Sequence, residues 1–114
     1  MSRPFSPQER GVIERLIELA PAEQRESLAE GVRISEAGEP CSCGCGSFDI
    51  DYPGKRPAQH WLVAEGFVDR PGRSLMSVML FAVDGRADFL EVYAPEHLDG
   101  DPPIPFPTAS EIQP

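Results

Sequence analysis

The sequence is poor in positive charge and in long apolar runs, and each shortage excludes a class of protein. Lys and Arg number 10 against 19 Asp and Glu, which gives a formal net charge of -9. Because this charge repels phosphate backbones and anionic membranes, we expect no nucleic-acid and no membrane partner, and we expect a protein partner to be basic. The longest apolar run, Val78–Val83, is strand-sized and far shorter than the ~18 residues of a membrane helix.

Cysteine is also scarce and is confined to one segment, "PCSCGCGSFDI". Because Cys41, Cys43 and Cys45 lie so close together, they cannot form a disulfide framework between distant parts of a fold. This usage is typical of a reducing compartment. The stretch "MSRPFSPQERG" has no apolar run, so we expect no secretory signal and a cytoplasmic protein.

The N-terminal segment carries the signals of helices. Ser6 and Glu9 have the spacing of a capping box, with Pro7 at the first helical position. Apolar residues then recur at helical spacing as far as Pro21, and Gly31 suits a C-cap. The segment predicts two short helices, or one helix kinked at Pro21.

Beyond this segment, alternation and apolar runs predict strands. The predicted strands are Val32–Ser35, Phe48–Tyr52, Trp61–Val68, Leu75–Val83 and Ala87–Ala94. Asp84-Gly85 predicts a two-residue hairpin turn, which would place Leu80 opposite Phe89 and Met79 opposite Leu90.

The composition and these elements together predict a single domain over 1–114, helical at 6–31, with a sheet at 32–94 and a proline-rich tail at 95–114. The tail cannot donate a regular ladder of hydrogen bonds, so we expect it to lie over the sheet through Ile104 and Phe106. The predicted fold class is α+β: one or two N-terminal helices packed on an antiparallel sheet of about four or five strands, with an extended C-terminal tail.

The interpretation that we favour for the cysteine segment is a plain structural turn of small residues. The first alternative is a zinc site, since thiolates are good zinc ligands. An extended Cys41–Cys45 segment would put its end Cα atoms ~13 Å apart, too far for one ion. The segment must therefore curl, which Gly44 and Gly46 permit. For the fourth ligand we expect His60, which is nearer in the sequence than His97.

Two other interpretations of this segment remain open. Cysteines two residues apart lie ~6.6 Å apart when extended, so a strained, exchangeable disulfide is one alternative. Glu39 and Asp49 oppose the low thiol pKa that a redox site needs. The segment also suits an anion-binding nest that ends at Ser47.

The other polar residues are weaker indications of a functional site. Asp49 and Asp51 share one strand face about 7 Å apart, a spacing that suits Mg²⁺ or Ca²⁺ but also a solvated strand face. No Gly-x-Ser-x-Gly, His-Glu-x-x-His or phosphate-loop pattern occurs, which favours a protein that is not an enzyme.

Several segments together resemble a group of small bacterial proteins with a Cys-x-Cys-Gly-Cys turn and a Leu-Glu-Val-Tyr strand. They are "PFSPQERGVIERLI", "CSCGCGSFDID", "LFAVDGRADFLEVYAPE" and the proline-rich tail. The matching residues are Cys43-Gly44-Cys45 and Leu90-Glu91-Val92-Tyr93. The resemblance implies a single cytoplasmic domain and carries no particular activity.

Two functional hypotheses follow. The first is a non-enzymatic, inhibitor- or immunity-like interaction domain that binds a basic protein through Asp49, Asp51, Asp88 and Glu91. The second is a zinc-binding or thiol-active protein centred on the three cysteines. An exposed sheet edge would also allow a homodimer.

Overall fold

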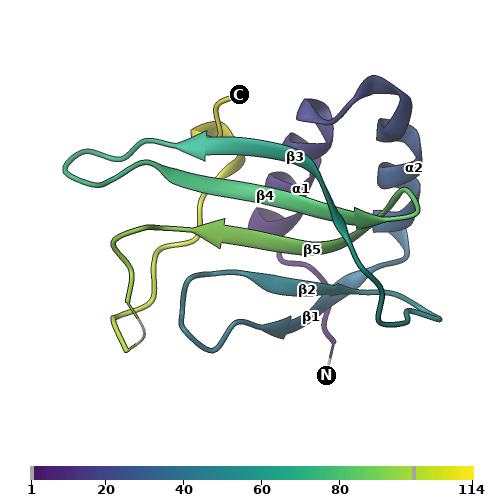
Figure 1. Ribbon diagram of the computed structural model, residues 1–114, viewed down its shortest axis with the longest axis horizontal. Coiled ribbons are helices and arrows are strands. Elements are labelled where there is room, and N and C mark those ends of the chain that lie inside the picture. Colours follow the sequence, from purple (N-terminus) through teal and green to yellow (C-terminus); the bar gives the residue numbers. More distant parts are fainter. Residues whose placement is uncertain (1, 99) are drawn as a thin grey trace.

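The chain folds as two helices against one face of a five-stranded antiparallel sheet, which confirms the predicted α+β class (Figure 1). The computed structural model describes residues 2–98 and 100–114. Its helices are α1 (Pro7–Leu19) and α2 (Ala22–Arg33). Its strands are β1 (Glu36–Pro40), β2 (Phe48–Asp51), β3 (Trp61–Val68), β4 (Met76–Val83) and β5 (Arg86–Tyr93). Across the sheet the order is β1-β2-β5-β4-β3.

The start of α1 confirms the predicted capping box. The Glu9 backbone N–H donates to the Ser6 hydroxyl at 3.1 Å, and the Ser6 N–H donates to the Glu9 carboxylate at 2.8 Å. Because these bonds satisfy N–H groups that have no partner inside the helix, they fix where α1 begins. The chain then forms two separate helices, with Pro21 at the N-cap of α2.

The predicted strand Val32–Ser35 is wrong. Helix α2 continues to Arg33, and the N–H groups of Ile34 and Ser35 bond back to the carbonyls of Gly31 and Val32. Val32 follows Leu28 by one helical turn, and both side chains are buried. Ile34, the other apolar residue of the alternation, is 56% exposed at the C-cap of α2. The two apolar residues therefore share no face, and an alternation of four residues is too short to distinguish a strand from the end of a helix.

The predicted β4–β5 register is also wrong, although its turn is at Asp84-Gly85 with φ of 50° and 77°. Leu80 lies opposite Leu90, and Phe81 lies opposite Phe89. Ala82 pairs with Ala87, so Asp88 is an extra residue on β5, a β-bulge that shifts every later pair by one.

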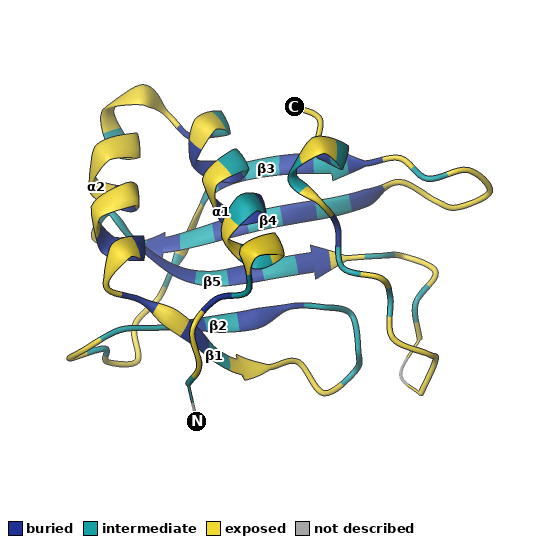
Figure 2. Cartoon of the chain, turned by 180° about the vertical axis from the view of Figure 1, so that it is seen from behind, coloured by how far each residue is buried: buried dark blue, intermediate teal, exposed yellow. Residues whose placement is uncertain are grey.

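The core lies between the helices and one sheet face (Figure 2). Alternate residues of β4 and β5 are buried there, while their neighbours on the other face are half-exposed. No helix covers that second face in the described part of the chain, as Figure 1 shows. No described helix is both long enough and apolar enough to span a bilayer.

The end of the tail is anchored to β3. Backbone bonds of 2.8 Å join Phe67 and Gln113 in both directions. Ile112 is 1% exposed and lies so close to Gly66 that a Cβ on this glycine would collide with it. Before these residues, the 3-10 helix η1 (Ala109–Glu111) places Glu111 against Arg70, with N···O distances of 2.9 and 3.0 Å.

The Arg70–Glu111 pair predicts a pH dependence of the tail anchor. Hydrogen bonds from Arg70 lower the pKa of Glu111 from 4.5 to about 2. A lowered folded-state pKa means that the ionised carboxylate stabilises the fold above pH 4.5, and that this contribution is lost as the pH falls toward 2. Glu111→Gln should therefore lower the free energy of unfolding at pH 7 and reduce its loss between pH 4.5 and 2, as measured by urea denaturation.

The control for this prediction is Glu14→Gln, at an exposed position of α1. This variant should keep the acid dependence of the unchanged protein. Parallel acid dependence in Glu111→Gln and the unchanged protein would contradict the proposed role of the pair.

Candidate metal centre

Residues 41–47, which join β1 to β2, form a closed loop that carries all three cysteines. The Cys41 N–H donates to the Ser47 carbonyl at 2.8 Å and closes the loop. Gly44 and Gly46 turn the chain with φ of 82° and 100°, values that favour glycine. The segment therefore curls, as a site built on three cysteines requires.

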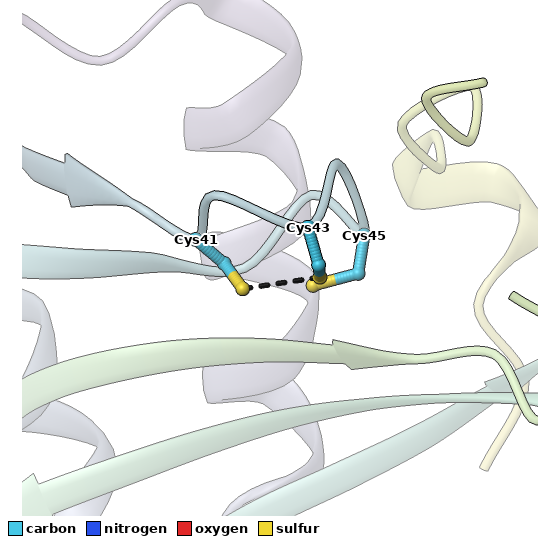
Figure 3. Close-up of side chains that lie close together, drawn as sticks. All are labelled: Cys41, Cys43 and Cys45. Atoms are coloured by element: carbon cyan, nitrogen blue, oxygen red, sulfur yellow. Dashed lines mark hydrogen bonds between the residues drawn. The ribbon is translucent and has the colours of Figure 1, made fainter. Parts of the chain in front are cut away.

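The loop brings the three sulfur atoms together. The Sγ atoms of Cys41, Cys43 and Cys45 all lie within 4.8 Å of one another, and the first two are 3.1 Å apart. Figure 3 shows the three side chains pointing to the same side of the loop. Ligands of a tetrahedral zinc ion lie about 3.8 Å apart, because each Zn–S bond is about 2.3 Å. The free thiols need only small movements to reach that spacing.

The loop is held on two sides. The buried Ser47 hydroxyl accepts from the Val92 N–H at 2.8 Å, which fixes the loop to β5. On the tail side, the Ile104 N–H donates to the Gly44 carbonyl at 3.1 Å. These bonds limit how far the sulfur atoms can separate.

Hydrogen bonds among the three cysteines shift the pKa values of Cys43 and Cys45 in opposite directions. Bonds to the sulfurs of Cys41 and Cys45 raise the pKa of Cys43 to about 11. Burial disfavours ionisation of Cys45, but hydrogen bonds with Ser47 and with the other two cysteines together outweigh it and lower the pKa of Cys45. The proton of Cys43 is therefore harder for a metal ion to displace than that of Cys45.

The structure does not bring His60 to the cysteines. Its Nδ1 lies 2.9 Å from the Asp88 carboxylate, and its ring centroid is 4.7 Å from that of Phe81. The group of metal-binding donors within the described residues consists of the three cysteines alone, so neither His60 nor His97 belongs to it. His60 is instead part of a polar network on the helix-free face of the sheet.

The histidine at the cysteine loop is His97, which sequence reasoning placed second. Its Nε2 lies 2.5 Å from the Cys43 carbonyl oxygen, across 54 residues of sequence. Strands β2 and β5 pair at Phe48 and Leu90, so the residues before β2 and those after β5 reach the same end of the sheet. No local pattern in the sequence indicated this proximity, because β3 and β4 lie between β2 and β5 along the chain.

The acidic residues that we expected to contact a partner are not all available at the surface. Asp88 is 7% exposed, so it is not the surface contact that we expected. Its carboxylate faces Lys55 Nζ at 3.2 Å and the Tyr52 hydroxyl at 3.4 Å. Asp49 lies 2.7 Å from the same Lys55 nitrogen, so its carboxylate has a cation already. Asp51 and Asp49 belong to no group of three metal-binding donors in the described residues.

The opposite pKa shifts of Cys43 and Cys45 predict which of these two thiols reacts first. Because the thiolate is the nucleophile, Cys45 should be alkylated by iodoacetamide at a lower pH than Cys43. Mass spectrometry of peptides from metal-free, reduced protein, labelled at a series of pH values, measures this order. Alkylation of Cys43 and Cys45 at the same pH in the folded protein would contradict the shared hydrogen bonds.

The donor atoms decide which ions the loop suits. Thiolates select Zn²⁺ or Cu⁺, whereas Mg²⁺ and Ca²⁺ require oxygen ligands. A nitrogen donor is close by on His97, and no carboxylate belongs to the group of donors found in residues 2–98 and 100–114. No protein-family model, curated protein or solved structure matches this chain.

Proposed function

We propose that the protein binds one zinc ion through Cys41, Cys43 and Cys45, with His97 as the fourth ligand. The observation that carries this proposal is the convergence of three sulfur atoms within 4.8 Å on one short loop. A plain turn requires only that the backbone bends, whereas a metal site also requires the side chains to point to one place. Three cysteines and one histidine form a common closed set of zinc ligands.

His97 is suited to the fourth position because its imidazole already lies against the loop. Its Nε2 lies within hydrogen-bond distance of the Cys43 carbonyl. Exchanging this contact for the ion would require a local movement of the ring. An ion held in this way would join the loop to the segment after β5, which already meet through Ile104 and Gly44.

The exposure of the loop favours reversible binding over a permanent structural site. Cys41 is exposed, and none of the three cysteines belongs to the buried hydrophobic core. The helices and sheet therefore have a core that does not depend on the ion. Zinc would stabilise the folded state by mass action, and its removal would leave the fold intact.

The first prediction from this proposal concerns stoichiometry. Reduced protein should bind about one zinc per chain, and zinc should raise the melting temperature, because the ion binds the folded state. Chelation should return the melting temperature to that of the metal-free protein without unfolding it. Elemental analysis and thermal denaturation provide the two measurements.

The variants for this experiment are Cys43→Ser and, as a control in the same loop, Ser42→Ala. Loss of a ligand should weaken zinc binding by more than ~100-fold, since outer partners alone contribute ~10–100-fold. Ser42 is exposed and its replacement should leave the affinity unchanged. Equal zinc affinity in Cys43→Ser and Ser42→Ala would exclude a thiolate site.

The second prediction separates the two histidines. His97→Ala should weaken zinc binding by ~10-fold or more, whereas His60→Ala should not change it, because His60 contacts Asp88 instead. Cobalt in place of zinc gives an absorption spectrum that is sensitive to loss of a nitrogen ligand. If His97→Ala left both the zinc affinity and the cobalt spectrum unchanged, His97 would not be a ligand.

A further inference from the structure

The two edges of the sheet are protected to different extents. On β1, Arg3 pairs with Ala37 through bonds of 2.9 and 2.8 Å. On β3, Gln113 pairs with Phe67. No other described residue forms a backbone bond along the outer side of Trp61–Glu65. The first half of the β3 edge is therefore free.

The free edge presents backbone groups that are ready to pair. The N–H and C=O of Phe67 point outward, since both bond to Gln113. Backbone directions alternate along a strand, so the N–H and C=O of Glu65 also point outward, one pair further along the same edge. The Gln113 bridge shows that a strand-like segment fits against this side of β3.

The side chains around the free edge are largely apolar. Trp61 is 64% exposed and Leu62 is 49% exposed. Beside them a shallow groove of about 430 Å³ separates β3 from the end of α1. The groove is lined by Leu19, Ala20, Pro21 and residues 62–65. Exposed edges are often protected by lysine, proline, other charges or a bulge. Strand β3 has no lysine or proline, and its protection is limited to Glu65 and a register shift between Leu62 and Ala64.

We propose that the free edge of β3 accepts an extended segment of a basic partner protein as a sixth strand. Backbone bonds to Glu65 and its neighbours would supply affinity, and alternate side chains of the partner would supply specificity. One set would meet the helix-free face, where Glu65, Met79 and Glu91 form a row across three strands. The other set would enter the apolar groove beside α1.

Charge decides the kind of partner. Glu65 is the one charged residue of β3, and the chain carries a formal net charge of -9. Antiparallel pairing with a second copy around Glu65 would bring two like charges together between two acidic molecules. A segment that alternates Lys or Arg with small apolar residues matches both sides of the edge. This surface is independent of the zinc proposal, because β3 and β1 are opposite edges of the sheet.

The test uses a synthetic ten-residue peptide that alternates arginine and valine, added to ¹⁵N-labelled protein. We expect chemical-shift changes at 61–65 and slower hydrogen exchange of the Glu65 amide. We also expect weaker binding at high salt, because the attraction is partly electrostatic. A fully N-methylated copy of the peptide, which cannot donate backbone bonds, and a glutamate–valine peptide should each bind at least ~10-fold more weakly.

Matched variants separate edge pairing from general charge attraction. Glu65→Arg should weaken binding of the arginine–valine peptide by ~10-fold or more. Glu14→Arg makes the same charge change at an exposed position of α1 and should have a small effect. Glu65→Gln gives a milder second variant if the arginine disturbs the fold. The zinc-site variant Cys43→Ser should bind the peptide normally, so that failure of one proposal does not imply failure of the other.

Three results would overturn this proposal. The N-methylated peptide would bind as well as the unmodified one, Glu14→Arg would weaken binding as much as Glu65→Arg, or the Glu65 amide would become protected by protein concentration alone. The last result would show that a second copy occupies the edge.

Discussion

The packing of the two helices on one face of the sheet, with α1 on β3 and β4 and α2 on β5, is the constraint on which the other features depend. Val12, Ile13 and Leu16 are fully buried against the sheet, and they require an apolar side chain wherever a strand faces them. Because side chains alternate along a strand, this contact fixes which residues of each strand point inward. A shift of one residue would expose the buried set and bury its polar neighbours.

The bulge at Asp88 is a consequence of this constraint. Without it, pairing that starts at the Asp84-Gly85 turn would put Phe89 opposite Leu80, and the faces of the two strands would no longer match. The extra residue restores Leu90 to the buried face and leaves Asp88 with Lys55, Tyr52 and His60 around it. These contacts hold His60 on the helix-free face, away from the cysteine loop.

The cysteine loop and the free β3 edge lie in different parts of the sheet and have different chemistry. The loop follows β1 and is tied to β5 and to the tail, so its sulfur atoms are held close together. The β3 edge is covered by Gln113 along part of its length, and its remaining backbone groups face solvent beside exposed Trp61. We therefore propose a different kind of binding for each feature, to a metal ion at the loop and to a polypeptide at the β3 edge.

The sequence by itself determined the local features of this protein. The capping box, the break at Pro21, the hairpin turn and the curl of the cysteine segment each depend on residues a few positions apart, whose preferences act directly on the backbone. The three cysteines were identifiable as a candidate site for the same reason. The tertiary structure decided the rest. The bulge at Asp88 satisfies packing between distant elements, and His97 reaches the cysteine loop because β5 pairs with β2. Such contacts join residues far apart in the chain, and no local preference determines which of them form.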